Sequence, residues 1–300
     1  MASGGYFKVL GKLACAGNRV VDETGRPVLL RGVNLSGMEY SSQPFAGVTP
    51  DELTTIVRGW GANVVRIPFV QARVLASGDE GGDYVEELRQ IVDWLAALGA
   101  YSILDLQWLD RETIWGPGDN RVPPRPDEQS PDCWAKLSEA FRGTPHVLFD
   151  LLNEPHDIDA EEWNAWAARL AAAARVADQD RVLLVSGVEW GFDLRGVWLE
   201  APNVIYSTHV YPWMSLDWWT RFGFRTEEAP VFAGEWGGEA GHTAWGRQLA
   251  AYFDQLGMGW TAWSWRDKPH LQRKGIPTEF GDVVFEALGV RWRTSAQGRS

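Results

Sequence analysis

The chain has 300 residues, of which 45% are hydrophobic and 23% charged, and its formal net charge is -12. A chain of this length buries a sizeable core and is typical of a soluble globular protein with one or two domains. The negative charge argues against a nucleic-acid partner, whose phosphates require Lys/Arg-rich surfaces. No apolar run approaches the roughly 20 residues of a membrane span, so we expect no membrane partner either.

The N-terminal segment 6–30 alternates loosely and carries a turn at 22–27, which predicts a hairpin or strap laid against the end of the domain. After it, apolar runs alternate with helical segments. The runs expected to be strands are 28–34, 63–68, 101–107, 147–154, 181–186, 203–209, 230–235 and 259–265. The expected helices are 50–60, 84–98, 132–143, 160–177, 244–256 and 280–288, with 216–224 a helix or an aromatic loop. The connection 108–131 is too long for a bare link, so we expect it at the rim of a site.

Eight buried strands alternating with helices, without an internal linker, indicate an α/β fold, a single (β/α)₈ TIM barrel with an N-terminal β-hairpin. The domain boundaries predicted are 1–27 for the lead and hairpin and 28–300 for the barrel. A doubly wound sheet is the alternative, but it requires a glycine-rich turn after its first strand, and residues 32–37 do not supply the GxGxxG pattern.

Tryptophan is unusually common, with 18 residues. Some must be core, because indole is large and mostly buried. Others follow predicted strand ends, where flat rings suit the apolar faces of sugars, although we expect packing to explain at least half. Cys15 and Cys133 have no zinc-site spacing, so we expect no metal, and the sequence leaves open whether they form a disulfide.

Large polar or aromatic residues stand at or just beyond the ends of the apolar runs. In a barrel of this kind the site lies at the C-terminal ends of the strands. Read in order, these residues are Asn34, Arg66, Gln107, Asn153, Glu154, Glu189, His209, Tyr211, Glu235 and Trp263. Any one of them alone is most simply a solvated loop residue, but so regular a set predicts a polar ring. Two of its carboxylates, Glu154 and Glu235, each follow an apolar run and suit the cleavage of a glycosidic bond.

The ordered motifs make the chain resemble glycoside hydrolase family 5, the cellulase-like retaining β-glycosidases. The resemblance rests on LRGVN at 30–34, VRIP at 65–68, NEP at 153–155, HVY at 209–211 and GEW at 234–236. It extends to Trp263 and therefore covers nearly the whole chain. It implies a (β/α)₈ barrel that cleaves β-glycosides without a cofactor.

Residue roles follow from the resemblance. Glu154 matches the general acid/base and Glu235 the nucleophile. The remaining matches support them: Arg66 holds the nucleophile, Asn153 binds the sugar 2-hydroxyl, His209 and Tyr211 flank the two acids, and Trp263 forms the floor under the sugar. Gln107 departs from the family, which usually has histidine there, so we expect altered substrate contacts and not lost catalysis.

The sequence contains further polar residues that bear on the site. Glu189, with Trp190 after it, is a candidate for contact with substrate, and Glu39 for an outer subsite. Asp105 is expected to be a structural partner for polar groups inside the barrel. His146 and His156 are expected in loops or on the surface.

Retention requires one carboxylate charged and the other protonated. We expect Arg66 and Tyr211 to lower the pKa of Glu235, and the resulting charge near an apolar wall to raise the pKa of Glu154.

The sequence therefore predicts a secreted, monomeric retaining hydrolase of β-1,4-glucan, with its signal peptide absent from this sequence. β-Mannan cleavage and transglycosylation are the nearest alternatives within the family. A non-catalytic carbohydrate-binding barrel and a metal- or phosphate-dependent barrel enzyme are the alternatives from other classes.

Overall fold

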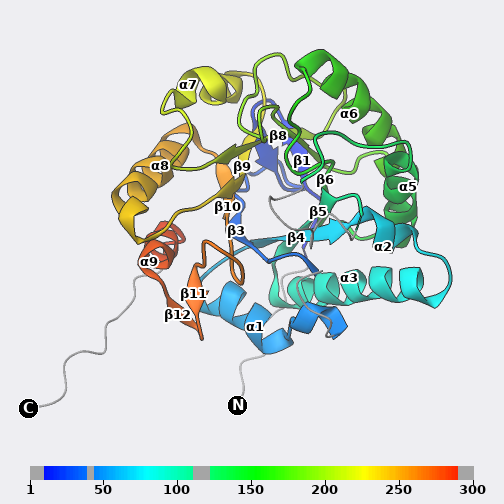
Figure 1. Ribbon diagram of the computed structural model, residues 1–300, viewed down its shortest axis with the longest axis horizontal. Coiled ribbons are helices and arrows are strands. Elements are labelled where there is room, and N and C mark those ends of the chain that lie inside the picture. The colour runs from blue at the N-terminus through cyan, green and yellow to red at the C-terminus, as the bar shows by residue number, and fades with distance from the viewer. Residues whose placement is uncertain (1–9, 39–43, 111–121, 290–300) are drawn as a thin grey trace, which may run out of the picture.

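The computed structural model describes residues 10–38, 44–110 and 122–289, apart from the side chains of residues 79–81. Eight parallel strands close into a barrel in the order β10-β3-β4-β5-β6-β7-β8-β9. Their bounds are β3 Arg31–Asn34, β4 Val64–Val70, β5 Tyr101–Trp108, β6 Val147–Asp150, β7 Leu183–Ser186, β8 Val204–Val210, β9 Val231–Trp236 and β10 Gly259–Ala262. Figure 1 shows the helices as an outer ring around these strands. The prediction of a single eight-stranded barrel is confirmed.

The helices occupy most of the segments predicted for them. They are α1 Pro50–Thr54, α2 Gln71–Leu75, α3 Asp79–Leu98, α5 Ser130–Ala140, α6 Ala160–Ala174, α7 Trp218–Arg221, α8 Thr243–Leu256 and α9 Glu279–Ala287. Helix α1 continues as a π-helical turn, Thr55–Gly59, and 3₁₀ turns occur at Pro44–Gly47, Gly223–Glu227 and Ala240–His242. Two elements were not predicted, namely α2 and the short hairpin of β11 Gln272–Arg273 and β12 Ile276–Pro277. No helix in the described part of the chain is long and apolar enough to cross a membrane.

Local capping explains where several helices begin and end. The Asp159 side chain accepts a hydrogen bond from the Glu162 backbone N–H and caps α6. Thr49 does the same for α1, with Pro50 at its first position. The predicted stop of α3 at Gly99 is observed, and this glycine adopts the left-handed conformation, φ 84°.

The inside of the barrel has an apolar layer below a polar layer. The apolar layer includes Val64, Ile103, Leu148, Leu184, Ile205 and Phe232, and Leu13 from the N-terminal segment packs with it. Two residues further along the strands, the inward positions become Arg66, Asp105, Asp150, Ser186 and Ser207, all fully buried. Since side chains two apart on a strand share a face, the strands that fill the barrel also aim these polar groups at its C-terminal mouth.

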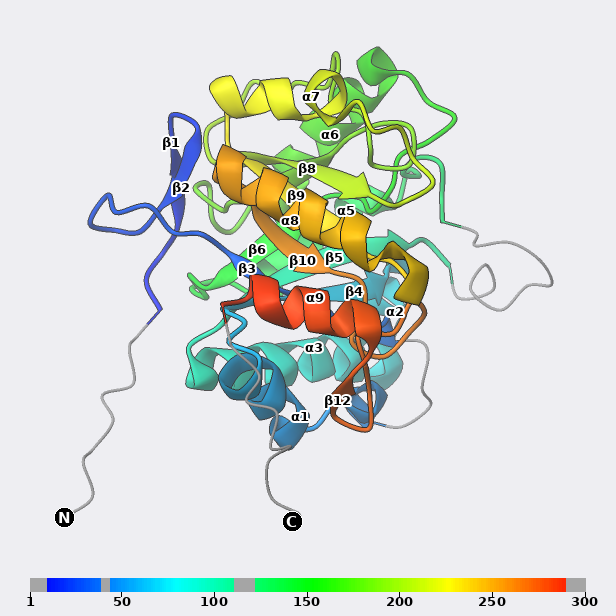
Figure 2. The same cartoon turned by 90° about the vertical axis from the view of Figure 1, so that its left-hand side faces the viewer.

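An N-terminal hairpin lies at the opposite end, as Figure 2 shows. Its strands are β1 Ala14–Ala16 and β2 Arg19–Val21, joined by a turn at 17–18. The predicted turn at 22–27 is also present, because the Gly25 N–H donates to Asp22 O at 2.9 Å and Val21 pairs with Pro27 in an antiparallel bridge. The backbone N–H of Cys15 donates to Asn203 Oδ1, directly before β8, at 2.9 Å. Cys15 and Cys133 are both free.

Several predicted boundaries are wrong. Strand β6 ends at Asp150, four residues before Glu154, and β10 ends at Ala262 instead of residue 265. Beyond Asp150 the N–H of Leu151 still donates to Leu184 O on β7 at 3.1 Å, and the N–H of Asn153 donates to Leu106 O on β5 at 3.1 Å. Helix α3 begins five residues earlier than predicted, and α6 ends three residues earlier.

Candidate active site

A cleft of about 810 Å³ opens at the C-terminal end of the barrel. Seven of the eleven predicted site residues line it: Gln107, Glu154, Glu189, Trp190, Tyr211, Glu235 and Trp263. The other four, Asn34, Arg66, Asn153 and His209, are fully buried and hydrogen-bond to one another or to the two glutamates. The predicted Glu39 and residues 111–121 of the long loop lie outside the described residues.

Glu235 faces the barrel interior because β9 contains an irregularity. The register runs Thr208 with Ala233 and then His209 with Glu235, which leaves Gly234 as the extra residue of a bulge. Simple alternation from Phe232 would turn residue 235 outward. Only glycine fits at 234, because a Cβ there would lie 2.5 Å from Ser207 Oγ and 2.8 Å from His209 Nε2. The bulge therefore places the nucleophile candidate beside His209.

Arg66 is the centre of the buried polar layer. Its guanidinium donates to Glu235 Oε1 at 3.0 Å, to Asp150 Oδ2 at 3.0 Å and to Asn153 Oδ1 at 2.9 Å. The guanidinium also donates to Asn34 Oδ1 at 3.0 Å and forms an ion pair with Asp105, whose Oδ1 lies 2.9 Å from Nη2. The prediction that Asp105 is a structural partner inside the barrel is confirmed. Five partners fix the guanidinium, so the carboxylate of Glu235 is held in one orientation.

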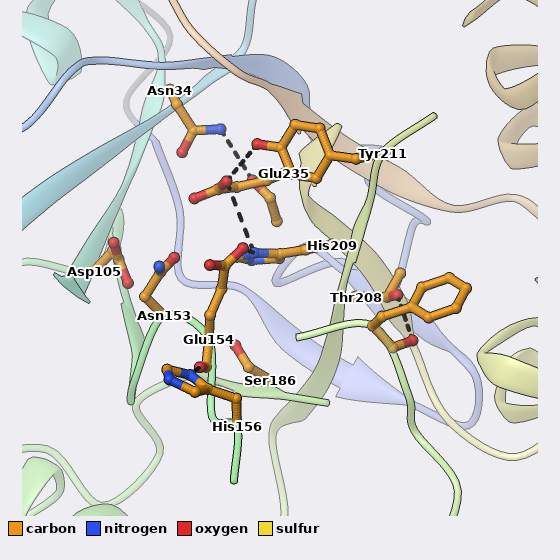
Figure 3. Close-up of polar contacts among 12 residues, drawn as sticks. Asn34, Asp105, Asn153, Glu154, His156, Ser186, Thr208, His209, Tyr211 and Glu235 are labelled. Atoms are coloured by element: carbon orange, nitrogen blue, oxygen red, sulfur yellow. Dashed lines mark hydrogen bonds and ion pairs between the residues drawn. The ribbon is translucent and has the colours of Figure 1, made fainter. Parts of the chain in front are cut away.

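Tyr211 and His209 contact the two acids, as Figure 3 shows. The Tyr211 hydroxyl donates to Glu235 Oε2 at 2.6 Å. His209 Nδ1 lies 2.8 Å from Glu154 Oε1 and 3.8 Å from Glu235 Oε2. One oxygen of each glutamate and one nitrogen of the histidine all lie within 4.8 Å of one another. The two acids, 81 positions apart in the chain, therefore meet across one imidazole ring.

Burial lowers the pKa of His209, which is therefore neutral, and raises the pKa of Glu154. Loss of solvent lowers the pKa of His209 to about 4. The ring then carries a single proton. Nε2 has no partner among the described residues, so we assign that proton to Nδ1, which donates to Glu154. Burial also raises the pKa of Glu154 to about 7, against the lowering by Arg66 and His156.

The expectation for Glu235 is wrong in its net direction. Arg66 and the Tyr211 hydroxyl do lower its pKa, as predicted, but burial outweighs them and raises the pKa above its ordinary value. The protonated forms of both acids are therefore stabilised by the dry barrel mouth. They differ in their partners, because Glu235 accepts from a permanent cation and a phenol whereas Glu154 accepts from a neutral ring. This asymmetry favours charge on Glu235.

Several other cleft groups have unused polar atoms or open rings. Gln107 Oε1 and Asn153 Nδ2 are buried and have no hydrogen-bond partner among the described residues. Trp263 is nearly buried, and its Nε1 donates to Lys268 O at 2.9 Å. Glu189 forms an ion pair with Arg221 at 2.9 Å. Rigid rings beside unsatisfied amides are suited to a sugar, whose faces are apolar and whose rim is made of hydroxyls.

Comparison with known proteins identifies the family of the chain. The family model described as cellulase (glycosyl hydrolase family 5) matches residues 21–269. The chain belongs to glycosyl hydrolase family 5. It is similar to endoglucanase E-5 of Thermobifida fusca, with 25% identity over 86% of this chain and 56% of that protein, and to endoglucanase MaCel5A of Microbulbifer sp., with 25% identity over 93% and 55%. The chain thus spans about half the length of these curated relatives.

Solved structures show the same fold. The β-glucanase SdGluc5_26A of Saccharophagus degradans in complex with cellotetraose superposes with a TM-score of 0.78, at 21% identity over 96% of this chain and 97% of that one. The catalytic domain of the Thermobifida fusca endoglucanase gives 0.74, at 20% identity over 94% and 98%. These superpositions confirm the fold, and the match of the family model confirms the predicted family.

Two residues of this family 5 site were missed in the sequence. His156 is buried, not on the surface, and its ring stacks on Trp190 with centroids 3.6 Å apart. Its Nδ1 bonds to the backbone carbonyl of Glu154 at 2.8 Å. Asp150 binds Arg66 from β6. Asp150 could have been predicted to face the barrel interior, because it lies two residues after Leu148 on the same strand. Nothing in the sequence predicts that His156 stacks on a residue 34 positions away.

Proposed function

We propose that the chain is a retaining glycoside hydrolase that cleaves β-1,4-linked glucan through a glycosyl-enzyme on Glu235. The observation that carries this is the approach of the two glutamates, since one oxygen of Glu154 lies within 4.8 Å of one oxygen of Glu235. Carboxyl groups of retaining glycosidases are about 5–5.5 Å apart, whereas inverting enzymes leave roughly 6.5–9.5 Å for a water. A separation this short favours direct attack by a carboxylate.

In the first step, a Glu235 oxygen attacks the anomeric carbon and the glycosidic C–O bond breaks. Glu154 gives its proton to the departing oxygen, so a group with a pKa of about 7 is suited to the task. The N–H of His209 occupies Oε1 of Glu154 and leaves Oε2 to carry that proton. Arg66 and Tyr211 hold Glu235 in place for attack.

In the second step, the Glu154 carboxylate removes a proton from water, which attacks the same carbon and releases Glu235. The negative charge on Glu154 has by then formed in a buried position. The free-energy cost of burying this charge is removed when the carboxylate takes up a proton from the attacking water. Asn153 Nδ2 and Gln107 Oε1 supply a donor and an acceptor for sugar hydroxyls, and Trp263 and Trp190 supply apolar faces.

β-Glucan is the proposed substrate class because the similar curated proteins are named endoglucanases and a similar structure holds cellotetraose. The proposal includes the remaining sequence predictions: a secreted monomer, no cofactor, and a hairpin region 1–27 packed on a catalytic barrel of residues 28–300. Glu154, His209 and Glu235 are close enough to ligate a metal ion. We assign them to acid–base chemistry, so chelators are expected to leave activity unchanged.

The test is the release of reducing ends from soluble β-1,4-glucan by the wild type and by Glu154→Gln and Glu235→Gln. Glu86→Gln is the control variant, because the side chain of Glu86 is 73% exposed and does not line the cleft. General acid–base catalysis contributes about 10²–10⁴-fold, so each catalytic variant should lose at least a hundredfold while the control retains most activity. A wild type inactive on glucan, mannan and xylan would overturn the enzyme assignment. High activity in either catalytic variant would overturn the roles.

A further inference from the structure

A second hollow, of about 420 Å³, lies at the barrel end that carries the hairpin. We call it the Trp198 hollow; its walls include Cys15 of β1, Trp198, Glu200, Asn203, Tyr206 and Glu228. Asn203 directly precedes β8, whereas the cleft residues His209 and Tyr211 stand at the end of that strand. At about 3.3 Å per residue, the strand separates the two places by roughly 20 Å. The hollow is therefore distinct from the cleft.

Trp198 is fixed in place although 43% of it is exposed. Its backbone N–H donates to Asn164 Oδ1 at 2.9 Å, and its indole N–H donates to Glu200 Oε2 at 3.0 Å. One face of the ring stacks on Tyr206, with centroids 5.5 Å apart and planes at 15°. The ring keeps this exposed area although it stacks on Tyr206. A ring held this way loses little side-chain freedom when a ligand covers it.

The polar groups around the ring select the ligand's chemistry. No Lys or Arg is among the described residues that line the hollow, and two carboxylates, Glu200 and Glu228, are. An anionic ligand would be repelled. In the hydrogen bonds of the described residues, each carboxylate uses only its Oε2, toward Trp198 and Arg225 respectively. The remaining oxygens are acceptors and suit hydroxyl donors.

A cationic ligand fits less well, although cations also bind aromatic rings and carboxylates. The Arg225 guanidinium already lies 5.1 Å from the Trp198 ring and 5.3 Å from the Tyr206 ring. It also pairs with Glu228 at 2.6 Å. Both rings and Glu228 therefore already have a cationic partner. A neutral polyol with an apolar face satisfies both the open ring and the acceptors.

We propose that the Trp198 hollow is a second binding site for β-glucan, which holds a chain of the substrate at the barrel end remote from the cleft. This inference rests on the proposed function, since β-glucan is the neutral sugar chain that the cleft is proposed to cleave. Binding there would keep the enzyme on a long polymer between cleavage events. It would not change the rate at which the cleft hydrolyses a short oligosaccharide.

Binding is tested by calorimetric titration of cellotetraose into Glu235→Gln, which is expected to bind without turnover. Two classes of site are expected. Trp198→Ala in this background should weaken the second class about tenfold, equivalent to 1.4 kcal/mol. Trp198→Tyr, which keeps a flat ring, should retain most of the binding. Trp219→Ala is the matched control, because Trp219 is 46% exposed and lines neither the cleft nor the hollow.

Activity gives an independent readout that a folding defect cannot imitate. In the active enzyme, Trp198→Ala should lower the rate on dilute polymer severalfold and leave cellotetraose hydrolysis unchanged. A single class of cellotetraose site, or binding of tetramethylammonium that Trp198→Ala abolishes, would overturn the proposal. A wild type that cleaves no β-glycan would instead overturn the proposed function, whatever the titration gives.

Discussion

The ionisation of Glu154 should be visible as a pH dependence of stability that Glu154→Gln removes. Burial raises the pKa of this carboxyl from its usual 4.5 to about 7 in the native state. Between these values the native state holds a proton that the unfolded chain has lost. Stability must then fall as pH rises from about 4.5 to about 7. At 1.36 kcal/mol per pKa unit, the loss above pH 7 is about 3 kcal/mol.

Thermal unfolding of the wild type and Glu154→Gln, measured from pH 4 to pH 9, is the assay. The amide cannot ionise, so the variant should be the more stable protein at alkaline pH. About 3 kcal/mol corresponds to roughly 5–10 °C for a domain of this size. Glu86→Gln is the control, because the side chain of Glu86 is 73% exposed.

The same ionisation should set the alkaline limb of kcat/KM near pH 7, because the first step needs the protonated acid. Parallel melting curves for the wild type and Glu154→Gln at all pH values would refute this reasoning. So would full activity that persists at pH 9.

Three further substitutions probe the groups around Glu235. Tyr211→Phe removes a hydrogen bond to a charged group, worth about 1.5–3 kcal/mol, so kcat should fall roughly 10–100-fold. The acid limb of the pH–rate profile should move to higher pH, because this bond lowers the pKa of Glu235. An unchanged acid limb would contradict that role. Arg66→Met leaves buried carboxylates unpaired and should destabilise the fold by about 3–5 kcal/mol in denaturant titration; a neutral effect would mean that they are not charged. Gly234→Ala forces a Cβ against His209 Nε2 at 2.8 Å, so activity should fall at least tenfold and stability by about 1–3 kcal/mol. An unchanged rate would argue against the bulge as the feature that orients Glu235.

The sequence predicted the barrel because each strand is an apolar run that ends in a polar residue. It predicted which residues gather at the mouth, since parallel strands bring their C-terminal ends to one side. It could not predict how Glu235 turns inward. That depends on the bulge at Gly234, where alternation alone gives the wrong face.

Long-range contacts were also beyond reach. The burial of His156 depends on its stack with Trp190, and the net pKa shift of Glu235 depends on how far the fold removes this carboxyl from water. Neither quantity is a property of local sequence. Asp105 was predictable as an interior group because it shares a strand face with Gln107.

The central claim is that Glu235 forms a covalent bond to the sugar while Glu154 handles the proton. The most direct measurement uses Glu154→Gln with an aryl β-cellobioside whose leaving group is too acidic to need protonation. Without a general base, the glycosyl-enzyme should accumulate. Intact-protein mass spectrometry should then show one added cellobiosyl unit, and peptide mapping should locate it on Glu235. A sugar attached to another residue, or an α-configured first product from the wild type, would contradict the account.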